Sequence, residues 1–184
     1  MKRFIVVFCL FPVLGYSIYI NDIDLKKEEV SKLSQYFRYR AIADTVFEKS
    51  KVSSIKYYEL VLEGIKNDFV SLARLSLVYS IKDVPELALY YGTNALEVYK
   101  SIDKSRIYTI NYIELMVSLS MVYATLNDEP KSYSYLDEAK TSLSKLILFK
   151  NDYSKAKELI DFAEQKYRDS FYKSSKKTNF NITN

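Results

Sequence analysis

Two matching five-residue stretches, 44 residues apart, constrain the fold of this chain more than any other feature of its sequence. They are Leu75-Ser-Leu-Val-Tyr79 and Leu119-Ser-Met-Val-Tyr123. Each is followed by a break that contains a proline, at Pro85 and at Pro130, and then by a second run with apolar residues at helical spacing. A duplicated pattern of this kind predicts a repeated helix–turn–helix unit.

Small side chains recur nine and sixteen residues after the tyrosine that ends each stretch. They are Ala88 and Ala95 after the first stretch, and Ser132 and Ala139 after the second. A Leu-Ser-x-x-Tyr core followed by small residues at these offsets resembles the tetratricopeptide repeat (TPR). The resemblance covers residues 35–165 and is closest over 69–102.

The resemblance implies an all-α fold, a TPR-like solenoid in which about seven helices form an antiparallel array of hairpins. Helices are expected from after Asn21 to about Glu48, and over about 54–66, 68–82, 84–101, 104–126, 130–150 and 152–172. The repeat-defining packing positions are Leu75, Tyr79, Ala88, Ala95, Leu119, Tyr123 and Ala139. The ten residues beyond the usual 34-residue period are assigned to an extension of the fifth helix, and the seventh helix is expected to be a cap that matches the second half of a repeat.

The two ends of the chain differ from its centre. Residues 1–17 are expected to be a signal peptide, with a basic start, an apolar run over 4–14 and a small-x-small cleavage site ending at Ser17. The helical domain is expected over 18–173, and residues 174–184 are expected to be a polar tail. These features predict export to a bacterial periplasm or cell envelope, with an uncleaved N-terminal anchor as the alternative.

Composition excludes several classes of site. Outside residues 1–17 the chain has neither Cys nor His, so it has no disulfide framework and no thiolate or imidazole ligand for a metal. Glycines at 15, 64 and 92 cannot form a phosphate-binding loop, and no cofactor is expected. Loss of Lys2 and Arg3 lowers the formal net charge from +4 to +2, which is too balanced for a dedicated nucleic-acid binder.

No catalytic residues are expected, and the chain is predicted not to be an enzyme. Carboxylates occur in pairs such as Glu59 with Glu63 and Asp161 with Glu164, but this spacing is typical of a solvated helix face. An enzyme acting on cell-wall sugar or peptide is the alternative, and it would require two facing acids in a cleft.

The resemblance also implies where a partner would bind, because the first helix of each repeat lines a concave groove in the family. Carried over to this chain, the expected partner-binding residues are Tyr36, Tyr39, Val70, Ala73, Leu77, Val117 and Met121. The same strip includes Ala43, Val46, Ser80, Glu114 and Ala124. Two interpretations stay open: neighbouring helices bury this mostly apolar strip, or it forms an exposed groove for an apolar or amphipathic peptide.

The expected function is that of a non-catalytic scaffold or adaptor of the cell envelope, binding an envelope protein or peptide. The alternative is a carrier that holds an apolar ligand or lipid in a cavity lined by some of the 18 tyrosines. Peripheral association with a membrane and self-association through the long fifth helix are further alternatives for its contacts.

Overall fold

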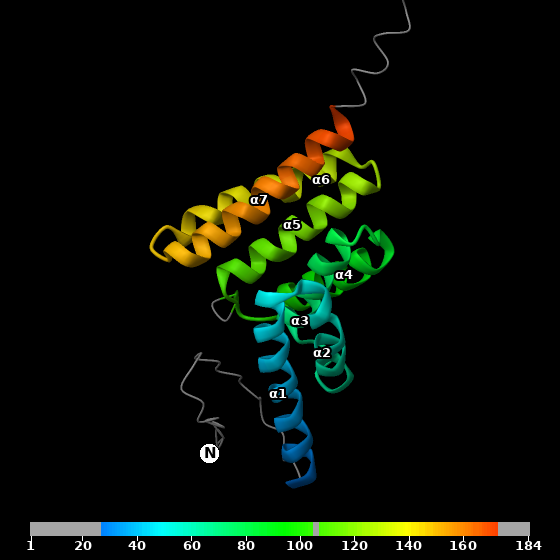
Figure 1. Ribbon diagram of the computed structural model, residues 1–184, viewed down its shortest axis with the longest axis vertical. Coiled ribbons are helices and arrows are strands. Elements are labelled where there is room, and N and C mark those ends of the chain that lie inside the picture. The colour runs from blue at the N-terminus through cyan, green and yellow to red at the C-terminus, as the bar shows by residue number, and fades with distance from the viewer. Residues whose placement is uncertain (1–26, 105–106, 173–184) are drawn as a thin grey trace, which may run out of the picture.

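The computed structural model describes residues 27–104 and 107–172, and these two ranges contain helices and no strand (Figure 1). The helices are α1 (Lys27–Lys49), α2 (Lys51–Gly64), α3 (Phe69–Ile81), α4 (Pro85–Ser101), α5 (Thr109–Thr125), α6 (Glu129–Leu143) and α7 (Lys150–Phe171). A short 3-10 helix, η2 (Ser144–Leu146), follows α6. The expected all-α fold is confirmed.

The expected signal peptide over 1–17 and the expected polar tail over 174–184 lie outside the described residues. The helix cap expected near Asn21 also lies outside them. None of the described helices combines the length and the apolar character that a membrane span requires.

Consecutive helices pack in pairs, α1 with α2, α3 with α4, and α5 with α6. The pairs stack on one another, because α5 packs on both α3 and α4 and α7 packs on both α5 and α6. In Figure 1, α1 stands almost vertical whereas α5, α6 and α7 run obliquely, so the array turns from its N-terminal to its C-terminal end. The fold is an antiparallel array of helix hairpins with one continuous apolar core.

The same turn closes the second and third hairpins. Asp83 and Asn127 both have left-handed backbone, with φ of 60° and 58°. The next amide in each turn donates to the carbonyl of the tyrosine five residues back, over 3.0 Å from Val84 to Tyr79 and 2.9 Å from Asp128 to Tyr123. This is the Schellman arrangement that ends many helices, here without glycine. The two turns are 44 residues apart, as are the two matching stretches.

Short side chains bring α3, α4 and α5 close together at one point. The Ser76 hydroxyl donates to the Ala88 carbonyl over 2.8 Å and lies 2.6 Å from the Ser118 hydroxyl. A Cβ atom added at Gly92 would lie 2.8 Å from Ser76 Oγ and 2.8 Å from Leu119 Cδ2. Larger side chains at these positions would force the helices apart.

The third hairpin has a serine–carbonyl hydrogen bond between the same two positions 44 residues later, with the donor on the second helix instead of the first. Ser132, which is at the position of Ala88, donates to the Ser120 carbonyl over 2.9 Å. In each hairpin two tyrosine rings stack across the helix pair. The ring centroids of Tyr79 and Tyr91 lie 5.7 Å apart, and those of Tyr123 and Tyr135 lie 5.6 Å apart. Of the repeat-defining positions, Leu75, Ala88, Ala95, Leu119 and Ala139 are fully buried, and Tyr79 and Tyr123 are half-buried.

Two expected helix starts differ from the structure. The break expected over 50–54 is a single residue, Ser50, whose hydroxyl caps α2 by accepting from the Ser53 amide. The expected extension of the fifth helix to Lys104 is wrong. Ile102 is extended, α5 begins at Thr109, and Ile107 packs on the core from the connecting segment, so its apolar character did not indicate a helix.

The C-terminal helices also differ from expectation. Helix α6 ends at Leu143 instead of Lys150, because the chain tightens into η2, where Leu146 is buried. Helix α7 begins at Lys150 after Phe149, so no Asn151-Asp152 cap is present.

Helix α7 takes the place of the first helix of a further hairpin, whereas it was expected to match a second helix. It packs on α5 and α6 as α5 packs on α3 and α4. Ala156, Ile160 and Ala163 are its buried face. The described residues contain no second helix to pair with α7.

Replacing Ala88 or Ala95 with leucine tests the close packing of the hairpins. Both alanines are fully buried, so we expect overpacking to lower the free energy of unfolding by about 1–3 kcal/mol. Glu97→Leu, at an exposed position of α4, is the matched control and should change it by less than about 0.5 kcal/mol. Chemical unfolding measures all three, and equal stability of the alanine variants and the control would contradict the assigned contacts.

Candidate partner-binding surface

The structure places the seven expected partner-binding residues in two groups. Ala73 and Leu77 on α3 and Val117 and Met121 on α5 are fully buried. Tyr36 and Tyr39 on α1 and Val70 on α3 are half-buried. Of the neighbouring strip positions, Ala43, Ser80, Glu114 and Ala124 are buried and Val46 is half-buried. The central part of the strip therefore belongs to the core, and contact of any of these residues with a partner stays a prediction.

Helix α7 reaches the ends of both α1 and α3. Near its start, Lys155 Nζ lies 2.6 Å from Glu48 Oε2 on α1. Near its end, Lys166 Nζ lies 2.8 Å from Asp83 Oδ1, just after α3, and the hydrogen bond lowers the pKa of Asp83 below its ordinary value. These ion pairs are exposed and contribute little stability. Helix α7 packs along α5, and these two ion pairs extend its contacts to the end of α1 and to the turn after α3.

A cluster of buried charges joins α1, α3 and α5 at the N-terminal end of the strip. We call Arg40, Asp44, Arg74 and Glu114 the charge cluster. Arg74 is its centre: Nη1 lies 2.7 Å from Asp44 Oδ1, and Nε lies 3.1 Å from Glu114 Oε2. Arg40 Nε lies 3.1 Å from the same Asp44 oxygen. Each of the four side chains is at most 12 % exposed.

Neutral groups complete the charge cluster. The Tyr58 hydroxyl donates to Asp44 over 2.8 Å, and the Asn111 amide donates to Glu114 over 2.9 Å. Asp68, the residue that caps α3, also pairs with Arg40. Burial alone would raise the pKa of Asp44, but the Arg40 and Arg74 charges outweigh it and lower that pKa. Burial raises the pKa of the Tyr58 hydroxyl, so it stays protonated. The cluster is a set of mutually satisfied ions and fits a structural role.

The sequence carries a signal for the charge cluster that the repeat pattern does not include. Arg74 and Glu114 each interrupt an otherwise apolar helix run, and a charge on a buried face is rare unless it is paired. Glu114 was expected in the groove, whereas no role was predicted for Arg40, Asp44 or Arg74. Which charge pairs with which depends on how the helices stack, and one sequence does not contain that information.

The described surface has an open groove between α6 and α7, with a volume of about 370 Å³. Its floor includes Leu136 and Tyr167, and Tyr133 and Tyr172 at its sides are 56 % and 58 % exposed. The Tyr133 and Tyr167 rings lie 6.1 Å apart. We call this hollow the α6–α7 groove. Its aromatic side chains are accessible to a partner, whereas the central residues of the α3 and α5 strip are buried.

Charged side chains form the rim of the α6–α7 groove. Glu164 accepts from Arg168 over 2.5 Å and lies 3.2 Å from Lys140 Nζ. The hydrogen bond from Arg168 is the main cause that lowers the pKa of Glu164. Two cations against one carboxylate leave the rim with a positive balance, which favours an acidic or polar partner surface around an apolar centre.

The described residues contain no group of three Asp or Glu side chains arranged to hold a metal ion. Three of the four carboxylates considered as catalytic pairs have other partners. Glu59 accepts from the Tyr79 hydroxyl over 3.2 Å, Asp161 pairs with Lys157 over 2.7 Å, and Glu164 lies on the groove rim. Each of these three carboxylates therefore already has a hydrogen-bond or ion-pair partner.

Comparison of the chain with protein-family models, with curated proteins and with solved structures found no match. The function of the chain is therefore inferred from its own residues and their contacts.

Replacing Arg74 tests the charge cluster. Arg74→Met leaves Asp44 and Glu114 buried without their shared cation, so we expect the free energy of unfolding to fall by about 3–5 kcal/mol. Arg168→Met, which removes a 61 % exposed arginine from an ion pair, should cost about 0–1 kcal/mol. Equal losses in the two variants, measured by chemical unfolding, would show that Arg74 is not buried among carboxylates.

The lowered pKa of Asp44 predicts a loss of stability in acid. In the unfolded chain this carboxyl has its ordinary pKa of about 3.9, above its value in the fold, so the unfolded state binds more protons on acidification. The contribution is complete above about pH 5 and is lost as the pH falls through the folded-state pKa. Chemical unfolding at a series of pH values should show that the free energy of unfolding falls less steeply on acidification in Asp44→Asn than in the wild type. Glu97→Gln, at an exposed position, should keep the wild-type slope.

Proposed function

We propose that this chain is a non-catalytic, TPR-like adaptor of the cell envelope that binds one helix of a partner protein in the α6–α7 groove. The proposal rests on the surroundings of α7 at the end of the array. Helix α7 stacks as the first helix of a hairpin, has no second helix among the described residues, and lies beside an open aromatic groove.

The two complete repeats support the family assignment in this proposal. Small residues follow the tyrosine at the same offsets in both, and the turns, serine contacts and tyrosine stacks recur 44 residues apart. Repeats of this kind bury their faces only by stacking on a neighbour. The last unpaired helix of such an array therefore presents a surface suited to one more helix.

The second helices of the two complete hairpins indicate what a helix paired with α7 would contribute. In α4 and α6 the second helix contributes a small residue against the first, Ala88 or Ser132, and a tyrosine that stacks on the first helix, Tyr91 or Tyr135. A partner helix for α7 is expected to combine small and aromatic residues on one face. Carboxylates at its edge would meet Lys140 and Arg168 on the rim.

A carrier of apolar ligands is less well supported. Two hollows in the described parts of the chain lie open at the surface, one between α6 and α7 and the other beside Glu59 and Tyr79. Beside the second hollow, the Tyr79 ring stacks on Tyr91 and its hydroxyl donates to Glu59.

Site-specific crosslinking in intact cells tests the proposal. A photoreactive phenylalanine analogue at position 133 or at position 172 should crosslink to the same single envelope protein, since both tyrosines border the groove. The analogue at Leu87, an exposed apolar position on α4, is the control and should not capture that protein. Capture of different proteins at 133 and 172, or equal capture from 87, would refute the groove as the binding site.

The affinity of the identified partner then gives the energetic test. Tyr133→Ala removes a 56 % exposed ring at the side of the groove, and we expect about tenfold weaker binding, the effect of an aromatic interface residue. Tyr90→Ala removes a 60 % exposed ring on α4 and should leave the affinity unchanged. An unchanged affinity in Tyr133→Ala would contradict the proposal.

A further inference from the structure

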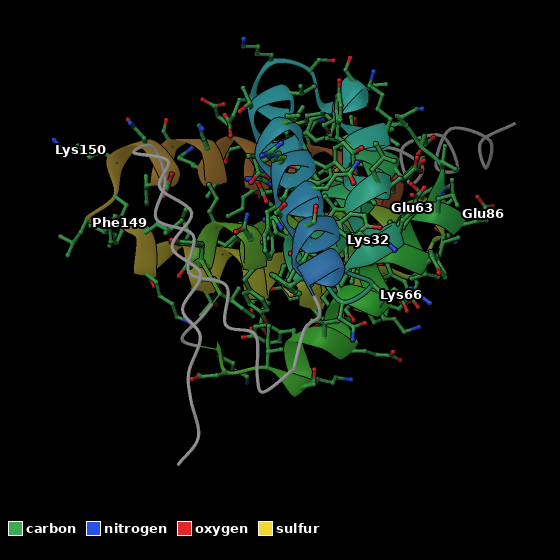
Figure 2. The ribbon with its side chains drawn as sticks, turned by 90° about the horizontal axis from the view of Figure 1, so that it is seen from below. Lys32, Glu63, Lys66, Glu86, Phe149 and Lys150 are labelled. Carbon is green, nitrogen blue, oxygen red and sulfur yellow. The ribbon has the colours of Figure 1, made fainter. Side chains whose placement is uncertain are left out.

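Three consecutive large apolar side chains protrude at the turn before α7. Ile147, Leu148 and Phe149 are 64 %, 89 % and 60 % exposed, and we call them the apolar tip. Figure 2 shows Phe149 and Lys150 at the outer edge of the molecule, directed away from the helices. Single exposed apolar residues are ordinary, but three in a row on one turn mark a contact surface.

The turn that carries the apolar tip is held in place by the core. Leu146 immediately before it is 4 % exposed and packs in the apolar core. The Phe149 amide donates to the Leu146 carbonyl over 2.8 Å, and the Tyr153 amide donates to the Phe149 carbonyl over 2.9 Å. The three side chains are therefore presented by a fixed backbone, and their exposure does not depend on a loose loop.

The surroundings of the apolar tip are basic. Lys150 follows it directly and Lys145 lies two residues before it, and both lysines are exposed. From Ser142 to Asn151 the chain has two lysines and no carboxylate, and Asp152 follows in the first turn of α7. The tip thus combines an apolar projection with positive charge around its base, which complements a surface that is apolar inside and anionic outside.

We propose that the apolar tip inserts into the interfacial region of a lipid bilayer that contains anionic lipids, with Lys145 and Lys150 against the headgroups. A bilayer suits this geometry because it accepts a small, deep projection. A stable protein dimer requires about 800 Å² from each partner, more than three side chains on a convex turn present. Long lysine side chains reach headgroups while their methylenes lie along apolar surface.

The membrane contact is separate from the α6–α7 groove. Glu164 on the groove rim lies about 20 Å along α7 from Phe149, at the helical rise of 1.5 Å per residue. The two sites can therefore be occupied together, so a lipid surface at one end of α7 leaves the other end free for a protein.

A single tryptophan tests the insertion, because the chain has none of its own. In full-length Leu148→Trp, phosphatidylcholine vesicles that contain phosphatidylglycerol should shift the emission to the blue, as for an indole entering the interface. Vesicles of phosphatidylcholine alone should give a smaller shift. Full-length Phe162→Trp, on the exposed side of α7, is the matched control and should keep its emission, even if another part of the chain brings the protein to the vesicle.

Charge removal completes the test. Adding Lys145→Gln and Lys150→Gln to Leu148→Trp should weaken the response to anionic vesicles by about tenfold, since each lysine near such a surface contributes to binding. The proposal is overturned if position 148 gives no shift with anionic vesicles. A shift that requires no vesicles and grows with protein concentration would also overturn it, because a second copy would then cover the tip.

Discussion

The array depends on a close approach of helices that only short side chains permit. Where α3 meets α4 and α5, the Ser76 hydroxyl binds the Ala88 carbonyl and lies 2.6 Å from Ser118, and Gly92 leaves room for Leu119. A methyl group added at Gly92 would already collide with two side chains. The same use of serine, 44 residues later, places α6 against α5. The stacking of the hairpins follows from these small contacts.

Close stacking has a consequence for binding. Because α3, α5 and α7 lie in succession, the strip that would line a groove in a longer array is buried at Ala73, Leu77, Val117 and Met121. The charge cluster around Arg74 fills its N-terminal end. Accessible aromatic surface remains where the stacking stops, between α6 and α7. In a short array of this kind the end of the stack is therefore better suited to a partner than its concave face.

Much of the fold could be predicted from the sequence, because the residues that define each repeat lie close together in the sequence. The Leu-Ser-x-x-Tyr stretches and the small residues placed α3, α4 and α6 within a few residues of their observed bounds, apart from the end of α6. The apolar residues near Ile107 and Leu146 were assigned to helices because periodicity alone does not distinguish a helix from a connecting segment that packs on the core. The place of α7 could not be predicted, since its alanines suit either helix of a hairpin.

The candidate site was less predictable than the fold. Whether Leu77 faces solvent depends on how closely α3, α5 and α7 stack, and these helices lie far apart in the sequence. The sequence contains the apolar tip as Ile147-Leu-Phe149, but its apolar residues were assigned to the predicted sixth helix. In the structure η2 follows α6 at Ser144–Leu146, so these residues lie in the turn before α7.

The most direct test of binding at the end of the array is the accessibility of position 77. In Cys9→Ser protein, which has no other cysteine, Leu77→Cys should react with a thiol reagent only as fast as the protein unfolds, because the side chain is fully buried. Glu97→Cys, at an exposed position of α4, gives the rate for an open site. Protection of position 77 in the folded protein is the predicted result. Reaction at the rate of position 97 would mean that the concave strip is open, and the preference for a partner at the end of the array would lose its physical basis.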